Sequence, residues 1–200
     1  MQPSPIKSRP IYAPLSPTET ARRHILAAEG EGARAIEAAL DGRPDLLRLA
    51  TIVYVPRASL SEAHAERLAA LGADALHVLP SVDTALTRLR GLLAGAAMGT
   101  RLYVAGAEDF LGRVAALADG FGIDEDAIQR EHRGSLARRV QCVHCKGFAD
   151  DVTASPFRCP HCGVPLLVRD HYSRRLGAFM GVSIDAEAPG DVPAAEEFPA

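Results

Sequence analysis

The chain has 200 residues, of which 48% are hydrophobic, and its formal net charge at pH 7 is −3. This length suffices for one medium domain or for a domain with a small module, and the composition is that of an ordinary globular protein. Because the chain has no run of about 18 apolar residues and its start is broken by prolines, we expect neither a membrane-spanning helix nor a secretory signal.

The first elements follow an extended arm, since the first 18 residues hold five prolines. Apolar runs then alternate with helical patterns, and Ser59 and Glu62 have the spacing of a capping box. The continuous β-branched run at residues 49–55 predicts a strand buried on both faces, and further strands are predicted at residues 23–28, 75–80, 101–107 and, as a short fifth strand, 127–131. The helical patterns cover residues 33–40, 62–73, 82–95 and 108–122. This alternation predicts a three-layer α/β domain with a parallel sheet.

The charge pattern divides the chain further. Residues 1–129 carry 13 basic and 16 acidic side chains, residues 130–175 carry nine and four, and residues 185–200 carry five acids and no base. We therefore predict four segments. They are a proline-rich arm (1–19), the α/β domain (20–132), a basic C-terminal module (133–184) and an acidic, flexible tail (185–200).

Glycines and one arginine follow three of the predicted strands. Gly30 and Gly32 come after the first strand, Arg57 after the second and Gly106 after the fourth. In an open α/β sheet, ligands bind at this edge, and glycines there let backbone N–H groups approach a phosphate. These four residues are the candidate nucleotide-binding residues of the chain.

The same stretch resembles the nicotinamide-nucleotide domain of ferredoxin reductase-type flavoproteins over about 110 residues, in the order strand, glycine turn, helix, strand with Arg, and second glycine turn. Three features depart from that family. Glu29 and Glu31 lie at the phosphate turn, Arg34 and Ala35 replace its TP, and the CGP turn is Ala105-Gly106-Ala107. A carboxylate about 4 Å from a phosphate costs roughly 4 kcal/mol at an effective dielectric of about 20. We therefore expect a scaffold that has lost nucleotide binding, with residual binding as the alternative.

All four cysteines lie in two CxxC pairs, Cys142 with Cys145 and Cys159 with Cys162. Four thiolates at this spacing are typical of a zinc ribbon, in which the closed ligand set makes the metal structural. Rubredoxin-like iron is the rival metal, and two disulfides are the alternative without metal. Clustered cysteines without an export signal favour a metal and a cytoplasmic protein. We expect His144 and His161, inside the knuckles, to be exposed rather than ligands.

A basic and apolar segment follows the second knuckle. Arginine, methionine and aromatic residues are enriched in protein interfaces, so the segment indicates a docking surface. The candidate interface residues are Arg169, His171, Tyr172, Arg174, Arg175, Phe179 and Met180. The alternatives are a segment that folds back onto the α/β domain and a catalytic pair of His171 with Asp170.

Three motifs together resemble a second family. The stretches KSRPIY near the start, the paired knuckles and VRDHYSRRLGAFMGV are similar to the small subunit of bacterial dimethylamine monooxygenase, the haem-dependent oxidative N-demethylase. The resemblance implies a non-catalytic subunit beside a haem-containing oxygenase subunit, a flavin/iron–sulfur reductase subunit and a folate-binding subunit. NADPH, flavin, iron–sulfur cluster and haem are then expected on those partners, and zinc on this chain.

Two other functions stay open. In the first, the α/β domain completes a nucleotide or electron-transfer site of the partner reductase. In the other, the ribbon is a nucleic-acid module, which the small basic excess of five charges in residues 130–175 makes the weaker hypothesis.

Overall fold

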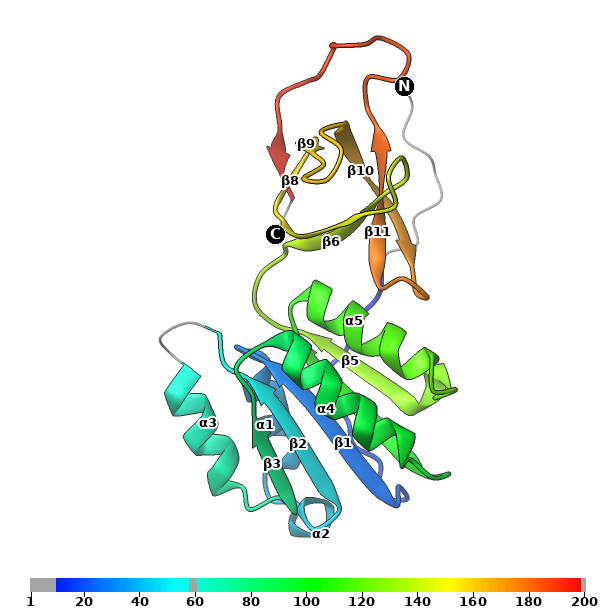
Figure 1. Ribbon diagram of the computed structural model, residues 1–200. Helices are drawn as coiled ribbons and strands as arrows, with labels where there is room; N and C mark the ends of the chain where they lie inside the picture. Colours follow the sequence, from blue (N-terminus) through cyan, green and yellow to red (C-terminus); the bar gives the residue numbers. More distant parts are fainter. Residues whose placement is uncertain (1–9, 58–60, 199–200) are drawn as a thin grey trace.

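The computed structural model describes residues 10–57 and 61–198, apart from the side chains of Ser61 and Glu62. Figure 1 shows two parts, an α/β domain and a C-terminal module of strands stacked at one end of it. The predicted capping box of Ser59 lies outside the described residues.

The α/β domain contains a five-stranded parallel sheet with the order β3-β2-β1-β4-β5. Its strands are β1 (Arg23–Glu29), β2 (Ala50–Val55), β3 (Ala75–Val78), β4 (Thr100–Gly106) and β5 (Ile128–His132). Its helices are α1 (Gly32–Leu40), α2 (Pro44–Leu47), α3 (Ser61–Ala70), α4 (Val82–Ala94), α5 (Glu108–Asp119) and the 3-10 turn η1 (Glu125–Ala127). The predicted α/β class and parallel sheet are confirmed, and α2 is an addition that the sequence pattern did not predict.

Two apolar layers hold the sheet between its helices. The central strands bury both faces, and β2 is buried at all six positions. Ile25 and Leu89 belong to the cluster under α4 and α5, whereas Leu26 and Ile36 belong to the cluster under α1 and α3. Ser81 starts α4 with a reciprocal cap to Thr84. The result is the expected three-layer arrangement.

The described part of the proline-rich arm lies along β5, at one edge of the sheet. The backbone N–H of Leu15 donates to Glu131 Oε2 at 2.7 Å, and that of Ser16 donates to Gln129 Oε1 at 2.7 Å. Tyr12 stacks on His132 with a centroid distance of 5.9 Å. The arm therefore covers an edge that would otherwise expose unpaired backbone groups.

The C-terminal module is a mixed sheet of order β7-β6-β11-β10-β9 with a two-stranded sheet of β12 and β8 beside it. The strands are β6 (Arg138–Cys142), β7 (Phe148–Val152), β8 (Ala154–Ser155), β9 (Phe157–Arg158), β10 (Pro165–Ser173), β11 (Ala178–Ser183) and β12 (Glu196–Glu197). The acidic tail that was predicted to be flexible thus carries β12, and the Phe198 ring lies 4.1 Å from the Arg138 guanidinium carbon.

The segment predicted to dock as an apolar tail is instead a β-hairpin of β10 and β11, and β11 is the central strand of the module's sheet. Phe179 is only 1% exposed, lies 5.1 Å from the Tyr172 ring and has the Arg138 guanidinium over its face at 4.5 Å. The prediction of Phe179 as an exposed docking anchor is therefore wrong, because the hairpin buries it in the core of the module.

The hairpin also joins the two parts of the chain. In Figure 1 the loop between β10 and β11 comes down beside α5. A Cβ atom at Gly112 of α5 would lie 2.6 Å from the carbonyl oxygen of Gly177 in that loop. The backbone of the module thus rests directly on the helix. Among the described residues no helix is both long and apolar enough to cross a membrane.

Candidate metal centre and the crevice of the α/β domain

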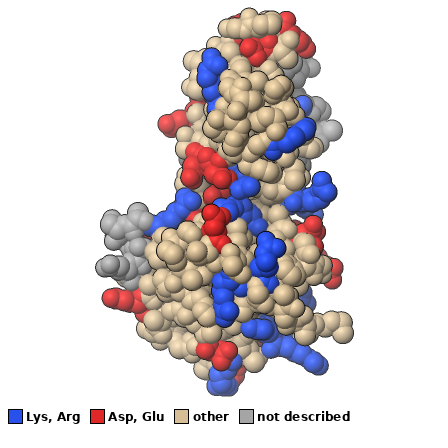
Figure 2. All heavy atoms as spheres, viewed as in Figure 1, with Lys and Arg blue, Asp and Glu red and all other residues tan. Residues whose placement is uncertain are grey.

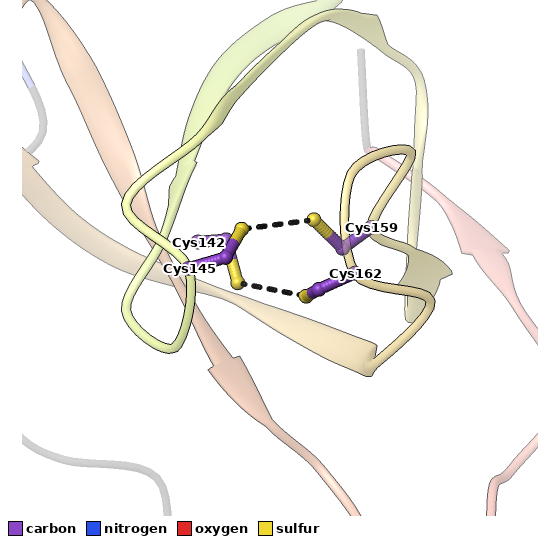
Figure 3. Close-up of side chains that lie close together, drawn as sticks. All are labelled: Cys142, Cys145, Cys159 and Cys162. Atoms are coloured by element: carbon purple, nitrogen blue, oxygen red, sulfur yellow. Dashed lines mark hydrogen bonds between the residues drawn. The ribbon is translucent and has the colours of Figure 1, made fainter.

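The four cysteine sulfurs converge between the two knuckles (Figure 3). Sγ of Cys142 lies 3.8 Å from that of Cys162, Sγ of Cys145 lies 3.7 Å from that of Cys159, and all four lie within 4.8 Å of one another. Tetrahedral thiolates about 2.3 Å from a zinc ion are separated by about 3.8 Å. The sulfurs are thus placed for one metal ion, and all four cysteines are free of disulfides.

The two knuckles share one backbone design. Lys146 N–H donates to the Cys142 carbonyl at 2.9 Å, and Gly163 N–H donates to the Cys159 carbonyl at 2.9 Å. Lys146 and Gly163 both have positive φ, at 63° and 73°. Each CxxC pair therefore sits on a tight turn that points both of its sulfurs to the same side.

The knuckle histidines lie outside the four-cysteine cluster. His144 and His161 are both exposed, and His161 Nε2 lies 2.7 Å from the backbone oxygen of Phe148. The His161 ring also lies over Gly147, where a Cβ atom would come within 2.4 Å of it. His161 therefore ties the second knuckle to the strand that follows the first.

The pKa values of two of the four thiols are shifted in opposite directions. Burial raises the pKa of the Cys159 thiol, but the backbone N–H groups of His161 and Cys162 outweigh it and lower the pKa to about 7. The Val164 N–H lowers the pKa of Cys162, but burial and the neighbouring thiols outweigh it and raise the pKa to about 12. Such a site loses protons when a cation binds, as thiolate metal sites do.

The glycine turns lie where β1 and β4 run side by side. Gly30 has φ of 50° and forms the turn after β1. A Cβ atom at Gly32 would lie 2.1 Å from the Ala105 carbonyl oxygen, and one at Gly106 would lie 3.2 Å from Glu29 Cβ. Close packing of α1 on β4 thus explains Gly32 without any bound phosphate.

Arg57 is surrounded by carboxylates of the chain itself. Its guanidinium lies 2.7 Å from Glu29 Oε1, 3.7 Å from Asp109 Oδ2 and 3.4 Å from Asp151 Oδ1. Glu29 ends β1, Asp109 is in α5, and Asp151 reaches over from β7 of the module. Figure 2 shows basic and acidic groups gathered at this junction of the two parts.

This cluster, Arg57 with Glu29, Asp109 and Asp151, holds more acid than base. The side chains of Glu29 and Asp109 are 1% and 4% exposed. Glu29 Oε2 is paired with no group among the described residues, and Asp109 Oδ1 lacks a hydrogen bond within the same described part. Burial, with help from Asp109, raises the pKa of Glu29 to about 7 against the pull of Arg57. Burial also raises the pKa of Asp109. The cluster therefore holds a proton near neutral pH.

The raised pKa of Glu29 predicts that the stability of the fold depends on pH. A carboxyl group whose pKa is raised on folding stabilises the native state while it is protonated, and that stability is lost as pH rises from about 4.5 to about 7. We expect the free energy of unfolding of the wild type to fall by at most about 3 kcal/mol between pH 5 and pH 8, and Glu29→Gln to abolish this fall. Urea unfolding at both pH values checks this, with the exposed Glu66→Gln as control. Parallel profiles of Glu29→Gln and the wild type would contradict it.

Sequence reasoning found only part of the cluster. Glu29 and Arg57 were singled out as turn residues, and Glu31 lies at the same turn, where it pairs with Arg34 at 3.1 Å. Asp109 was detectable, because it follows the Gly106 turn at the same edge of the sheet. No sequence pattern indicated Asp151, because its contact with Arg57 depends on how the module docks on the α/β domain.

The other predicted interface residues lie on the β10–β11 hairpin. Arg169, His171, Arg174 and Arg175 are exposed, whereas Tyr172 and Met180 are half-buried. Asp170 accepts a hydrogen bond from Arg138 Nη1 at 3.1 Å, so it forms an ion pair within the module. The exposed basic groups remain available as a docking surface.

Fold and site together define an α/β domain with an appended module whose four clustered cysteines could bind a metal ion. The family model described as the N-terminal domain of "Dimethylamine monooxygenase subunit DmmA-like" matches residues 4–128, and the model of its C-terminal domain matches residues 139–182. The chain belongs to this DmmA-like family of dimethylamine monooxygenase subunits, as the resemblance predicted.

One curated relative and several solved structures are similar to the chain. The "Heme-dependent oxidative N-demethylase delta subunit" of Ectopseudomonas mendocina is 39% identical over 115 residues, which is 58% of this chain and 66% of that protein. The chain is thus matched over less than two thirds of this relative. The FAD/NAD-binding domain of nitric oxide dioxygenase from Vibrio cholerae is 19% identical, with a TM-score of 0.41 over 59% of this chain and 54% of that one. An intact type IV self-sufficient cytochrome P450 monooxygenase is 19% identical, with a TM-score of 0.48 over 88% of this chain and 22% of that one.

Proposed function

We propose that the chain is a non-catalytic interaction subunit of a multi-subunit, NADPH-dependent haem monooxygenase that oxidatively demethylates dimethylamine. Membership of the DmmA-like family supports a role as a subunit, and the name of the curated relative supports a haem-dependent demethylase. The partners would be the haem oxygenase, flavin/iron–sulfur reductase and folate-binding subunits, which would carry the redox cofactors. The complex would act in the cytoplasm, where four free cysteines stay reduced.

The observation that carries the non-catalytic part is the cluster around Arg57. Arg57, which lies at this edge and could bind a phosphate there, already pairs with three carboxylates of the chain. A nucleotide phosphate would have to displace Asp151 and stand beside the buried Glu29. Although the cluster holds one proton, its other carboxylates keep a negative charge, and their repulsion of a phosphate at close range in a partly buried site costs several kcal/mol. A structural role of the α/β domain fits this arrangement better than cofactor binding.

We propose zinc as the metal of the module. The four thiolates would fill the coordination shell, so the ion would have no position for a substrate and would act on folding alone. Cys142, Cys145, Cys159 and Cys162 would hold it, and the ribbon would then present the basic hairpin in a fixed position.

The alternative function, a nucleotide or electron-transfer site shared with the partner reductase, is favoured by the position of Arg57, whose side chain is 43% exposed. The substitution Arg57→Lys distinguishes the non-catalytic role from the shared nucleotide site, because lysine keeps the charge but cannot make the planar, bidentate contact of arginine with a phosphate. Under our proposal the variant leaves the KM for NADPH of the assembled complex unchanged, whereas the alternative requires that KM to rise.

Reconstitution tests the proposal itself. The remaining subunits are assembled with and without this chain, and their sedimentation and dimethylamine-dependent NADPH oxidation are compared. We expect omission of the chain to lower both the assembled fraction and the rate, and addition of the chain to restore both. Full assembly and full activity without it would contradict the proposed role.

A further inference from the structure

An open groove of about 500 Å³ lies where three segments of the chain meet. The arm contributes Pro10–Tyr12, the α/β domain contributes α5 with η1 and β5, and the β10–β11 hairpin contributes Tyr172 and Arg174. These segments are far apart in the sequence, and the hairpin contributes to the groove because the module lies beside α5 (Figure 1). Its volume lies within the range of about 300–1,000 Å³ that is usual for binding sites.

The walls of the groove are fixed by contacts behind them. Tyr12 donates from its hydroxyl to Glu108 Oε1 at 3.2 Å and stacks on His132. Tyr172, which also lines the groove, packs edge-on against the buried Phe179. The groove is therefore preformed, which lowers the entropic cost of binding.

The lining combines apolar and charged side chains. Ala115, Ile123 and Ile128 provide its aliphatic surface. Ile11 lines the groove and is 98% exposed, so its burial by an occupant would be favourable.

The basic residues of the hairpin favour an acidic occupant beside them. Both oxygens of Glu125 accept from Arg130, at 2.8 and 2.6 Å, so this acid is already neutralised. Arg174 is exposed and lines the groove, and Arg175 is exposed beside it in the chain. Asp119 is the acid that remains unpaired among the described lining residues, and it lies on the opposite element, α5.

The geometry points to this groove as the socket for an extended segment of a partner subunit, with an apolar side chain that fills the space over Ala115 and a carboxylate that pairs with Arg174. The inference rests on the proposed function and reverses the expected docking: the apolar plug belongs to the partner, because Phe179 and Tyr172 of this chain are committed to its own core and wall. Ile11 would be covered in the complex.

The test measures how tightly the purified chain binds the assembled remaining subunits. Ala115→Trp fills the groove from α5 and is expected to weaken binding at least tenfold. Its control, Ala94→Trp, adds the same side chain at an exposed position of α4, and should change the affinity less than twofold. Arg174→Glu repels an acidic segment without filling the groove and is expected to weaken binding similarly, with the exposed Arg90→Glu of α4 as its control.

A photo-cross-linker at position 115 identifies the occupant by mass spectrometry of the linked peptide. We expect a peptide of a partner subunit with Asp or Glu beside an apolar residue. A link to another segment of this chain, a linked basic peptide, or wild-type affinity of both Ala115→Trp and Arg174→Glu would overturn the socket. If the wild-type chain itself fails to bind the other subunits, the proposed function falls instead, so the two failures are distinct.

Discussion

Replacing Cys159 by serine is expected to unfold the C-terminal module and to leave the α/β domain folded. Structural zinc in small modules contributes about 10–16 kcal/mol of apparent binding free energy, comparable with or larger than the whole stability of a typical domain. The module's remaining core is small, with Val140, Val168 and Phe179 among its few buried side chains. The α/β domain has two larger apolar clusters of its own and does not depend on the metal.

Elemental analysis and amide hydrogen exchange check this result. We expect the wild type to carry one zinc per chain and Cys159→Ser to lose both the metal and the protection of β6, β10 and β11. His144→Ala is the matched control, because His144 lies in a knuckle, is exposed and is not a ligand. Protected strands without any metal would contradict a structural metal site. Stoichiometric iron with a visible absorption band would replace zinc by the rubredoxin-like alternative.

Gly32→Ala is expected to destabilise the α/β domain by about 3 kcal/mol, the upper end of the usual cost of overpacking. The added Cβ atom would lie 2.1 Å from the Ala105 carbonyl oxygen. Ala105 is in the buried strand β4, so its backbone has little room to move. The start of α1 would have to shift away from the sheet.

Gly91→Ala is the control for this substitution. Gly91 lies inside α4 and has no atom within 4 Å of an added Cβ, so alanine there should stabilise the helix by about 0.5–1 kcal/mol. Chemical unfolding of both variants measures the difference. A neutral or stabilising Gly32→Ala would mean that α1 does not press on β4, and that the glycine is present for another reason, such as a bound phosphate.

The strands and metal ligands were predictable from the sequence because their signals are local. β2 is a continuous β-branched run that is buried on both faces, and two CxxC pairs define their own knuckles. The chain order of the alternating elements was enough to predict the parallel sheet.

The failures concern contacts between distant segments. The sequence around Phe179 has an apolar composition that fits an exposed anchor as well as a central strand, and only the pairing of β11 with β6 decides between them. Asp151 has a left-handed backbone, with φ of 55°, inside β7, and its contact with Arg57 arises from the docking of the module. Neither feature repeats at a period that sequence patterns reveal.

Calorimetric titration of the purified chain with NADPH tests most directly the proposal that the α/β domain is a scaffold in which Arg57 is already paired with carboxylates of the chain itself. With Glu29, Asp109 and Asp151 around Arg57, we predict weak binding or no measurable heat of binding. A dissociation constant in the low micromolar range would contradict the scaffold and would favour a nucleotide site in this chain.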